Sequence, residues 1–186
     1  MDLARERILE RVRTAVRVPA PQPAPPSDSR IWPQLDNIEF QFRTEFQALR
    51  GELIADADAL RGFLRGFKLI ATDESELVRG TVGEGNASVR ACELGVTTCE
   101  CLVARTGSIV VSTRALSVLP PVHLVIARRD QLVPGLTAAM ALLRQRYGRR
   151  WPSALSVVTG PSRTADIEKI LVMGAHGPKR LALYFA

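Results

Sequence analysis

The residues best suited to chemistry in this chain gather between positions 159 and 178. This stretch carries small hydroxyl side chains, an arginine, two carboxylates and one of only two histidines, together with two Gly/Pro turns. A buried polar group without a partner costs about 1–3 kcal/mol, so a packed core has no use for this mixture. These groups must therefore be engaged by the protein's own backbone, by a ligand or by a partner protein.

The first half of this stretch has the pattern of a strand exit followed by a helix start. It reads Thr159-Gly-Pro-Ser-Arg-Thr-Ala-Asp-Ile-Glu168. Thr164 is a good N-cap for a helix that begins at the next residue, and Asp166 and Glu168 would complement the helix dipole by about 0.3–1 kcal/mol each. Two carboxylates at a helix start also disfavour a phosphate there. Because capping leaves Ser162 and Arg163 unexplained, a structural and a ligand-binding interpretation both stay open.

The second half ends the expected helix and turns the chain into a final strand. It reads Gly174-Ala-His-Gly-Pro178, in which a glycine suits the position after a helix and a proline prevents the helix from resuming. His176 lies between the two turns and could either brace nearby carbonyls or transfer protons. The sequence has no serine or cysteine nucleophile motif nearby, so it does not indicate a catalytic triad.

Two further tracts carry polar groups. Thr106-Gly107-Ser108 lies between two expected strands, where a hairpin turn needs no function but the hydroxyls could also contact a ligand. His123 opens an apolar strand, and we expect it to be a satisfied histidine of the core or its rim.

The three cysteines, Cys92, Cys99 and Cys101, favour core packing over metal binding. Zinc and iron–sulfur sites usually need four ligands in paired C-x2-C spacing, and an odd number of cysteines argues against a disulfide framework. On one strand, Cys99 and Cys101 would share a face as two small buried hydrophobic residues. We therefore expect no metal and no cofactor in this chain.

Strands and helices alternate along most of the chain. Helical patterns fall at 2–17, 35–50, 56–67, 75–79, 132–147 and from 165 onward, and strand patterns at 52–55, 68–71, 99–104, 108–112, 122–127, 154–158 and 180–185. This alternation predicts an α/β fold with a mainly parallel sheet and helices on both faces. Ligands gather at the carboxyl ends of such strands, where residues 159–164 would lie. The Gly-rich loop 80–88 lacks both common nucleotide-binding patterns.

The chain divides into three parts by composition. Residues 1–17 form an amphipathic helix, 18–34 a Pro-rich linker and 35–186 the α/β domain.

The net charge is +6, but only three of the 25 basic residues are lysine and the arginines are spread among acidic residues. This distribution indicates a coding bias rather than a nucleic-acid surface, so we expect no nucleic-acid partner. The longest apolar runs are far below the roughly 18 residues of a membrane span, and we expect a cytoplasmic protein without membrane contact.

Four segments together resemble the lactate-utilisation protein C family, the LUD domain. They are Ala104 to Val111, Leu116 to His123, Thr159 to Glu168 and Gly174 to Pro178. The resemblance runs from about Leu35 to the end and implies a fold similar to ribose-5-phosphate isomerases, glucosamine-6-phosphate deaminases and CoA transferases. This chain departs from the family pattern at two positions: Ser108 stands where the family is expected to have threonine, and Arg163 stands where it usually has a small residue.

The resemblance implies a function in a bacterial system that oxidises L-lactate to pyruvate. This chain would be a subunit or accessory protein without a cluster, with iron–sulfur subunits as partners and a small carboxylate or a phosphorylated compound as ligand. The alternative is an independent CoA transferase-like or isomerase-like enzyme. Combined with the patterns above, the catalytic candidates are His176, Asp166 and Glu168, and the ligand-binding candidates are Thr106, Gly107, Ser108, Ser162, Arg163, Thr164 and Gly177.

Overall fold

The structure is a computed structural model of the 186-residue chain, and it describes residues 2–17, 32–164, 172–173 and 177–186. The chain forms two units, Met1–Pro33 and Gln34–Ala186. The first unit contains α1 (Asp2–Arg17), which confirms the predicted helix. Its apolar side chains Ile8, Leu9 and Val12 are exposed. The predicted linker lies largely outside the described residues.

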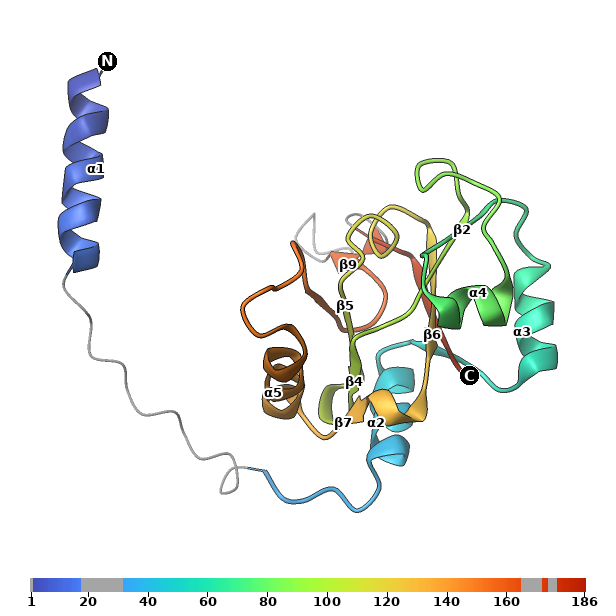
Figure 1. Cartoon of the computed structure of the whole chain (residues 1–186). Helices are drawn as coiled ribbons and strands as arrows, with labels where there is room; N and C mark the ends of the chain where they lie inside the picture. Colours follow the sequence, from blue (N-terminus) through green and yellow to red (C-terminus); the bar gives the residue numbers. More distant parts are fainter. Residues whose placement is uncertain (1, 18–31, 165–171, 174–176) are drawn as a thin grey trace. The chain divides into compact units, whose positions relative to one another are not determined.

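A five-stranded parallel sheet forms the centre of the second unit (Figure 1). Its order is β1 (Glu52–Ile54), β11 (Arg180–Phe185), β6 (Val122–Ala127), β3 (Leu94–Thr97) and β2 (Ile70–Thr72). Every neighbouring pair is parallel. The predicted α/β fold with a mainly parallel sheet is thus confirmed.

A second sheet lies beside the first and contains the predicted hairpin. Its order is β7 (Leu132–Val133), β4 (Cys101–Val103), β5 (Ser108–Val111) and β8 (Ser156–Val158), with β4 and β5 antiparallel around a short 3-10 turn, η2 (Ala104–Thr106). A two-stranded ladder joins β9 (Arg163–Thr164) to β10 (Val172–Met173). The strand predicted at 154–158 therefore exists, but it belongs to this second sheet and not to the parallel one.

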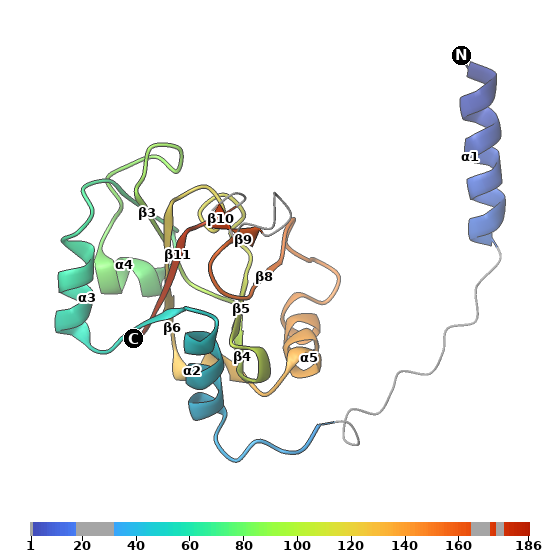
Figure 2. The ribbon, with the colours of Figure 1, turned by 180° about the vertical axis from the view of Figure 1, so that it is seen from behind.

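The two faces of the parallel sheet are covered differently. The helices are α2 (Ile38–Ala48), α3 (Ala57–Leu64), α4 (Glu76–Val82) and α5 (Leu136–Tyr147). On one face, Leu124 and its neighbours pack against Leu60 of α3 and Val78 of α4. On the other, Val125 and Leu183 pack against α2 and the second sheet. The helix α5 covers the far side of the second sheet, so the layers run from α5 to α3 and α4 (Figures 1 and 2).

Three predicted elements differ from the structure. The helix expected from residue 132 begins at Leu136, because Leu132 and Val133 pair with β4. The helix expected from residue 165 to Gly174 is wrong at its end, since Val172 and Met173 form a strand paired with β9. The strand β3, whose four residues include a glycine, was not predicted.

The Gly-rich loop covers a sheet edge and does not form a phosphate cradle. The amide of Gly85 donates to the hydroxyl of Thr72 at 2.9 Å, and the side chain of Asn86 bonds the backbone of Lys68 and Ile70. A Cβ on Gly85 would lie 2.8 Å from the carbonyl oxygen of Ile70. The glycine is therefore needed for close approach to the edge strand β2.

Among the described residues, no helix combines the length and the apolar character needed to cross a bilayer.

Candidate functional site

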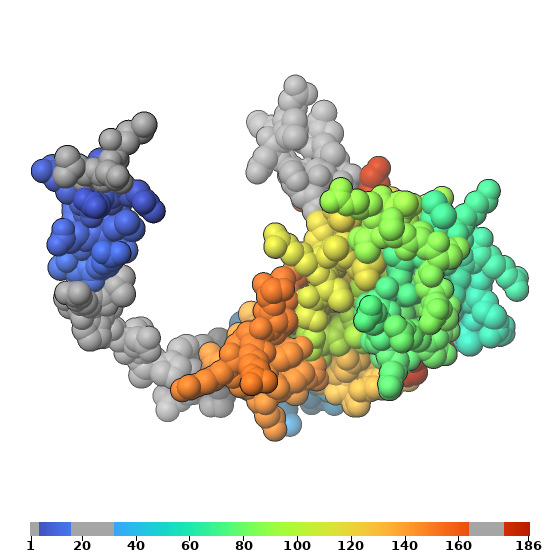
Figure 3. All heavy atoms as spheres, turned by 45° about the horizontal axis from the view of Figure 1, so that its top comes forward, coloured from blue at the N-terminus to red at the C-terminus, as the bar shows by residue number. Residues whose placement is uncertain are grey.

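A pocket of about 370 Å³ lies where the two sheets meet the start of β11. Its described lining residues are Ser117, Val118, Val158, Thr159, Gly160, Pro161, Ser162, Arg163, Gly177 and Pro178. All of them except Val158 come from three of the four segments that carry the family resemblance. Figure 3 shows the molecule from this side, with residues of the 113–120 segment at the surface in yellow.

Backbone hydrogen bonds hold the three segments together. The amide of Ser162 donates to the carbonyl of Pro178 at 2.9 Å, and the amide of Lys179 donates to Pro121 at 2.8 Å. Pro121 and Lys179 immediately precede β6 and β11, so the pocket lies at the amino ends of these strands (Figure 2). The expectation that residues 159–164 follow a strand of the parallel sheet at its carboxyl end is therefore wrong, because β8 is an edge strand of the second sheet.

Two glycines let the pocket walls approach closely. Gly160 has φ +84°, and a Cβ there would lie 2.8 Å from the carbonyl oxygen of Leu49. Gly177 lies over Ser162, whose Cβ would be 3.3 Å from an added Cβ. The predicted ligand-binding role of Gly177 is thus compatible with its position, since it shapes the pocket through its backbone.

The fourth segment reaches the pocket through a line of hydroxyl groups. The Oγ of Ser108 lies 2.8 Å from the Oγ1 of Thr159 and 2.7 Å from the Oγ1 of Thr106. Ser108 is only 2% exposed and does not line the pocket, whereas Thr159 is exposed and does. Of the predicted tract 106–108, Ser108 is therefore linked to the site through Thr159, and Thr106 is linked to it only through Ser108.

Gly107 has a packing role. Its φ is +58°, and a Cβ there would lie 2.4 Å from the backbone nitrogen of Phe46 in α2. Only glycine allows the hairpin turn to approach the helix this closely. The close packing against α2 therefore accounts for the glycine at position 107, and no contact with a ligand is needed to explain it.

Ser162 and Arg163 provide the polar chemistry of the pocket. Ser162 is half-buried, and its hydroxyl has no hydrogen-bond partner among the described residues. Arg163 is exposed, and its Nη2 lies 3.5 Å from the position that a Cβ of Gly160 would take. The described lining thus contains a cation, hydroxyl groups and apolar walls, and no carboxylate.

The remaining candidates cannot be placed in the same way. Asp166, Glu168 and His176 lie outside the described residues, and of Thr164 only the backbone is described. Thr164 in β9 pairs with Val172 in β10. The helix that it would cap begins outside the described residues, so its capping role stays a prediction. The catalytic assignment of His176, Asp166 and Glu168 stays a prediction.

His123 is a fully buried core histidine. Its Nε2 lies 2.9 Å from the hydroxyl of Thr97, while its Nδ1 has no partner among the described residues. Burial lowers the pKa of His123 to about 4. The prediction of a core histidine is confirmed, but only one of its two nitrogens is satisfied.

A cluster of side chains occupies the carboxyl end of the parallel sheet, where ligands often bind. The ring of Phe185 lies 5.0 Å from the guanidinium carbon of Arg43 and 5.4 Å from that of Arg129. Glu39 bonds both arginines, with Nη2 of Arg43 at 2.7 Å and Nε of Arg129 at 3.2 Å. The hydrogen bond from Arg43 holds the pKa of Glu39 below its usual value. These groups satisfy one another and anchor α2 to the sheet.

All three cysteines are buried and free of disulfides. The expectation that Cys99 and Cys101 share a face is wrong, because β4 begins only at Cys101 and the two side chains enter different clusters. Burial raises the pKa of Cys101 to about 11 and raises that of Cys99 further. Within the described part of the chain, histidine, cysteine and carboxylate side chains form no group of three suited to a metal.

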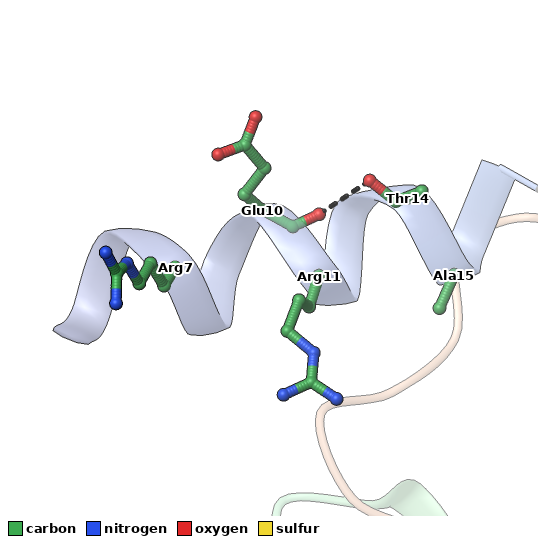
Figure 4. A pocket seen from close by; sticks show the side chains of 5 residues that line it. All are labelled: Arg7, Glu10, Arg11, Thr14 and Ala15. Atoms are coloured by element: carbon green, nitrogen blue, oxygen red, sulfur yellow. Dashed lines mark hydrogen bonds between the residues drawn. The ribbon is translucent and has the colours of Figure 1, made fainter. Parts of the chain in front are cut away.

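A second hollow lies along α1 in the first unit (Figure 4). Its described lining is Arg7, Glu10, Arg11, Thr14 and Ala15, and the hydroxyl of Thr14 donates to the carbonyl of Glu10 at 2.8 Å. All of these residues come from one helix, which provides no opposing wall. Ligand sites usually enclose most of the ligand surface, so this hollow is the weaker candidate.

The sequence prediction did not include Ser117, Val118, Thr159 or Pro161 among the site residues, although all four lie within segments that carry the family resemblance. Ser117 is 3% exposed, and its hydroxyl donates to the carbonyl of Thr113 at 2.6 Å. The sequence feature that could have predicted this part of the pocket wall is the polar Ser117 within the largely apolar segment 116–123.

Comparison with known proteins identifies relatives for most of the second unit. The model of the LUD domain matches residues 48–185. Lactate utilization protein C of Bacillus licheniformis is 36% identical over 53% of this chain and 45% of its own length, and that of Bacillus subtilis is 34% identical over similar shares. The chain thus spans about half the length of these curated relatives. An uncharacterised Escherichia coli protein, YkgG, is 28% identical over 74% of this chain and 73% of its own length.

A solved structure supports the fold. A DUF162 family protein from Deinococcus radiodurans aligns with a TM-score of 0.55 and 19% identity, over 80% of this chain and 95% of that one. At this identity the similarity concerns the fold alone. The family resemblance predicted from the four segments is confirmed by the match to the domain model.

Proposed function

Because the chain belongs to the LUD domain family, we propose that it acts in a bacterial system that oxidises L-lactate to pyruvate. In this proposal it is a subunit or accessory protein that carries no iron–sulfur cluster, binds a small ligand in the pocket at the start of β11, and works with cluster-bearing partner subunits. The names of the relatives from Bacillus licheniformis and Bacillus subtilis support the link to lactate.

The observation that carries the ligand-binding part is the convergence of the family-like segments on one pocket. Three of them line it, and the fourth reaches it through the hydrogen bond between Ser108 and Thr159. Arg163, the hydroxyl of Ser162 and the hydroxyl of Thr159 suit an anionic group, and the walls formed by Val118 and Val158 suit a short apolar body. Small carboxylates combine both features.

A thermal shift assay tests the ligand. L-lactate, pyruvate, CoA and ribose 5-phosphate are added in turn to the full chain and to an Arg163→Gln variant. A ligand present at 100 times its dissociation constant adds about 2.7 kcal/mol to the free energy of unfolding. We expect L-lactate or pyruvate to stabilise the wild type and to stabilise the variant less. Stabilisation by CoA or ribose 5-phosphate alone would favour the independent enzyme instead.

A genetic test addresses the cellular role. We expect deletion of the gene to abolish growth on L-lactate as sole carbon source and to leave growth on pyruvate intact. We also expect the chain to co-purify with iron–sulfur subunits of the same system. Normal growth on L-lactate together with a chain that purifies alone would contradict the proposal.

A further inference from the structure

We infer that Ser108 is a positioning residue of the pocket, and that it directs the hydroxyl proton of Thr159 toward an anionic ligand that accepts hydrogen bonds. This inference rests on the proposed function in one respect, namely that the pocket binds a small ligand. It goes further by giving a role in ligand binding to a buried residue that does not line the pocket.

Strand pairing fixes the geometry of the two residues. In the antiparallel pair of β5 and β8, Ile109 is opposite Val158, which brings Ser108 and Thr159 together at the next position. Ser108 is 2% exposed, and its Oγ is 2.8 Å from the Oγ1 of Thr159. Because Thr159 lines the pocket, the contact connects the buried strand to the ligand space.

The protons on these hydroxyls have only two arrangements. Ser108 has one proton, and its possible acceptors are the two threonine hydroxyls and the carbonyl oxygen of Thr106. The carbonyl is 3.4 Å away, beyond the usual range of about 2.5–3.0 Å for O–H···O bonds. The serine therefore donates either to Thr106 or to Thr159.

Each arrangement presents a different group to the pocket. If Ser108 donates to Thr106, then Thr159 must donate to Ser108 and only its lone pairs face the ligand. If Thr106 donates to Ser108, then Ser108 donates to Thr159, and the proton of Thr159 is free for the ligand. In the second arrangement the hydroxyls form a chain of donors in which each bond strengthens the next.

The rest of the described lining selects the second arrangement. The guanidinium of Arg163 is a donor only, and the hydroxyl of Ser162 has no described partner. A ligand group that meets both must be an acceptor, and its negative charge would be favoured by Arg163. An acceptor facing Thr159 draws the proton of Thr159 outward, which requires Ser108 to donate to Thr159.

The remainder of β5 gives no packing reason for a serine. Ile109, Val110 and Val111 are apolar and almost fully buried, and a buried hydroxyl is costly unless it is bonded. Ser112 provides a matched comparison, because its hydroxyl also makes a 2.7 Å bond, but to Glu100, which is not among the described lining residues of the pocket.

The test measures the affinity of small probes by NMR titration, with the amides of Gly160 and Ser162 as reporters. Acetate, L-lactate and ethylammonium are titrated into the full wild-type chain and into Ser108→Ala, Ser108→Thr, Thr159→Val, the double variant Ser108→Ala/Thr159→Val and the control Ser112→Ala. We expect the anions to bind and ethylammonium not to bind.

We expect Ser108→Ala to weaken anion binding roughly tenfold, the scale of one hydrogen bond to a charged group. Ser108→Thr, which keeps the hydroxyl, and Ser112→Ala should both bind as the wild type does. In the Thr159→Val background, Ser108→Ala should have no further effect, because its action passes through Thr159. A merely structural role of Ser108 would not produce this dependence.

Four results would overturn the inference. Unchanged anion affinity in Ser108→Ala, or additive losses in the double variant, would remove the positioning role while the proposed function stands. Preferential binding of ethylammonium would reverse the ligand polarity. A wild type that binds none of the three probes at this pocket would refute the pocket assignment in the proposed function, and the inference with it.

Discussion

At the scale of single residues, the buried histidine has the clearest consequence for stability. Burial lowers the pKa of His123 to about 4, below the value near 6.5 expected in the unfolded chain. The unfolded state therefore takes up a proton between these two values and the folded state does not. The contribution of His123 to the free energy of unfolding is therefore fully present above pH 6.5 and decreases as the pH drops toward 4. The total decrease from this residue is about 3 kcal/mol.

Urea unfolding of the wild type and of His123→Gln at pH 7.5 and pH 4.5 measures this effect. Carboxylates such as Glu39 also titrate in acid, so the informative quantity is the difference between the two proteins. We expect the wild type to lose more free energy of unfolding than the variant over this range. Equal losses would mean that His123 is protonated in the folded protein.

Substitution of the hairpin glycine should separate close packing from backbone conformation. Gly107 and Gly148 both have positive φ, at +58° and +54°. A Cβ on Gly107 would lie 2.4 Å from the amide nitrogen of Phe46, whereas nothing lies within 4 Å of one on Gly148. Gly107 is in the left-handed helical region, with ψ 23°, whereas Gly148 has ψ −111° and is strained for other residues in a different way. We expect Gly148→Ala to cost about 1–3 kcal/mol from backbone strain alone and Gly107→Ala to cost more than that, because the clash with α2 adds to its strain. Equal free energies of unfolding for the two variants would show that the turn and α2 are not in close contact.

Residue types indicated where a candidate site lies, but not the partners of each side chain. The stretch 159–178, selected for its hydroxyls, its arginine and its Gly/Pro turns, provides residues 159–163 and 177–178 of the pocket lining. The indirect position of Ser108 was not predictable, because its distance from Thr159 follows from the pairing of β5 with β8, about fifty residues apart. A glycine at position 107 could indicate a turn, but it could not indicate that α2 packs against this turn.

At the scale of elements, an ion pair links α5 to the segment before β4, in addition to the packing of Ala139 and Leu143 against the second sheet. Arg146 of this helix bonds the side chain of Glu100 in the segment before β4, and Ser112 and Tyr147 add further hydrogen bonds to the same carboxylate. Burial would raise the pKa of Glu100, but these bonds outweigh it and lower the pKa. The carboxylate is thus charged and largely enclosed.

Removal of the arginine should leave this carboxylate without its cation. We expect Arg146→Ala to lower the free energy of unfolding by about 1–3 kcal/mol, less than for a fully buried pair because Arg146 is 41% exposed. Arg144→Ala is the control, because Arg144 lies on the same helix and forms no ion pair within the described part of the chain. Chemical denaturation of both variants checks this. A similar small loss in both would show that the ion pair contributes nothing.

Long apolar elements were predictable and short paired ones were not. The strand β6 was predicted at its observed bounds because six apolar or buried residues follow one another. In contrast, β3 contains Gly95, which is required because a Cβ there would lie 2.6 Å from the carbonyl of Leu116. The strand β10 was mistaken for part of a helix, and Thr164 of β9 was interpreted as its N-cap, since a threonine followed by acidic residues resembles a helix start. The secondary structure of such short segments depends on which strand they pair with in the folded protein, and this pairing is not visible in their own sequence.

At the scale of the whole molecule, the buried core is confined to the second unit. The residues of its four apolar clusters all lie between Leu35 and Phe185, and the described side chains of α1 from residue 4 to residue 15 are exposed. We expect a chain that begins at Gln34 to unfold cooperatively, with a midpoint within about 2 °C of the full chain. Differential scanning calorimetry measures both midpoints. A large drop, or loss of cooperative unfolding, would show that residues 1–33 are part of the folding unit.

The central claim is that residues 158–163, 117–118 and 177–178 form a binding site for a small anion. A titration of the ¹⁵N-labelled full chain with L-lactate tests it most directly. We expect saturable changes in amide chemical shift that are largest at Thr159, Gly160, Ser162 and Gly177. Changes centred on Phe185 and Arg129 at the opposite end of the parallel sheet, or no saturable change anywhere, would contradict it.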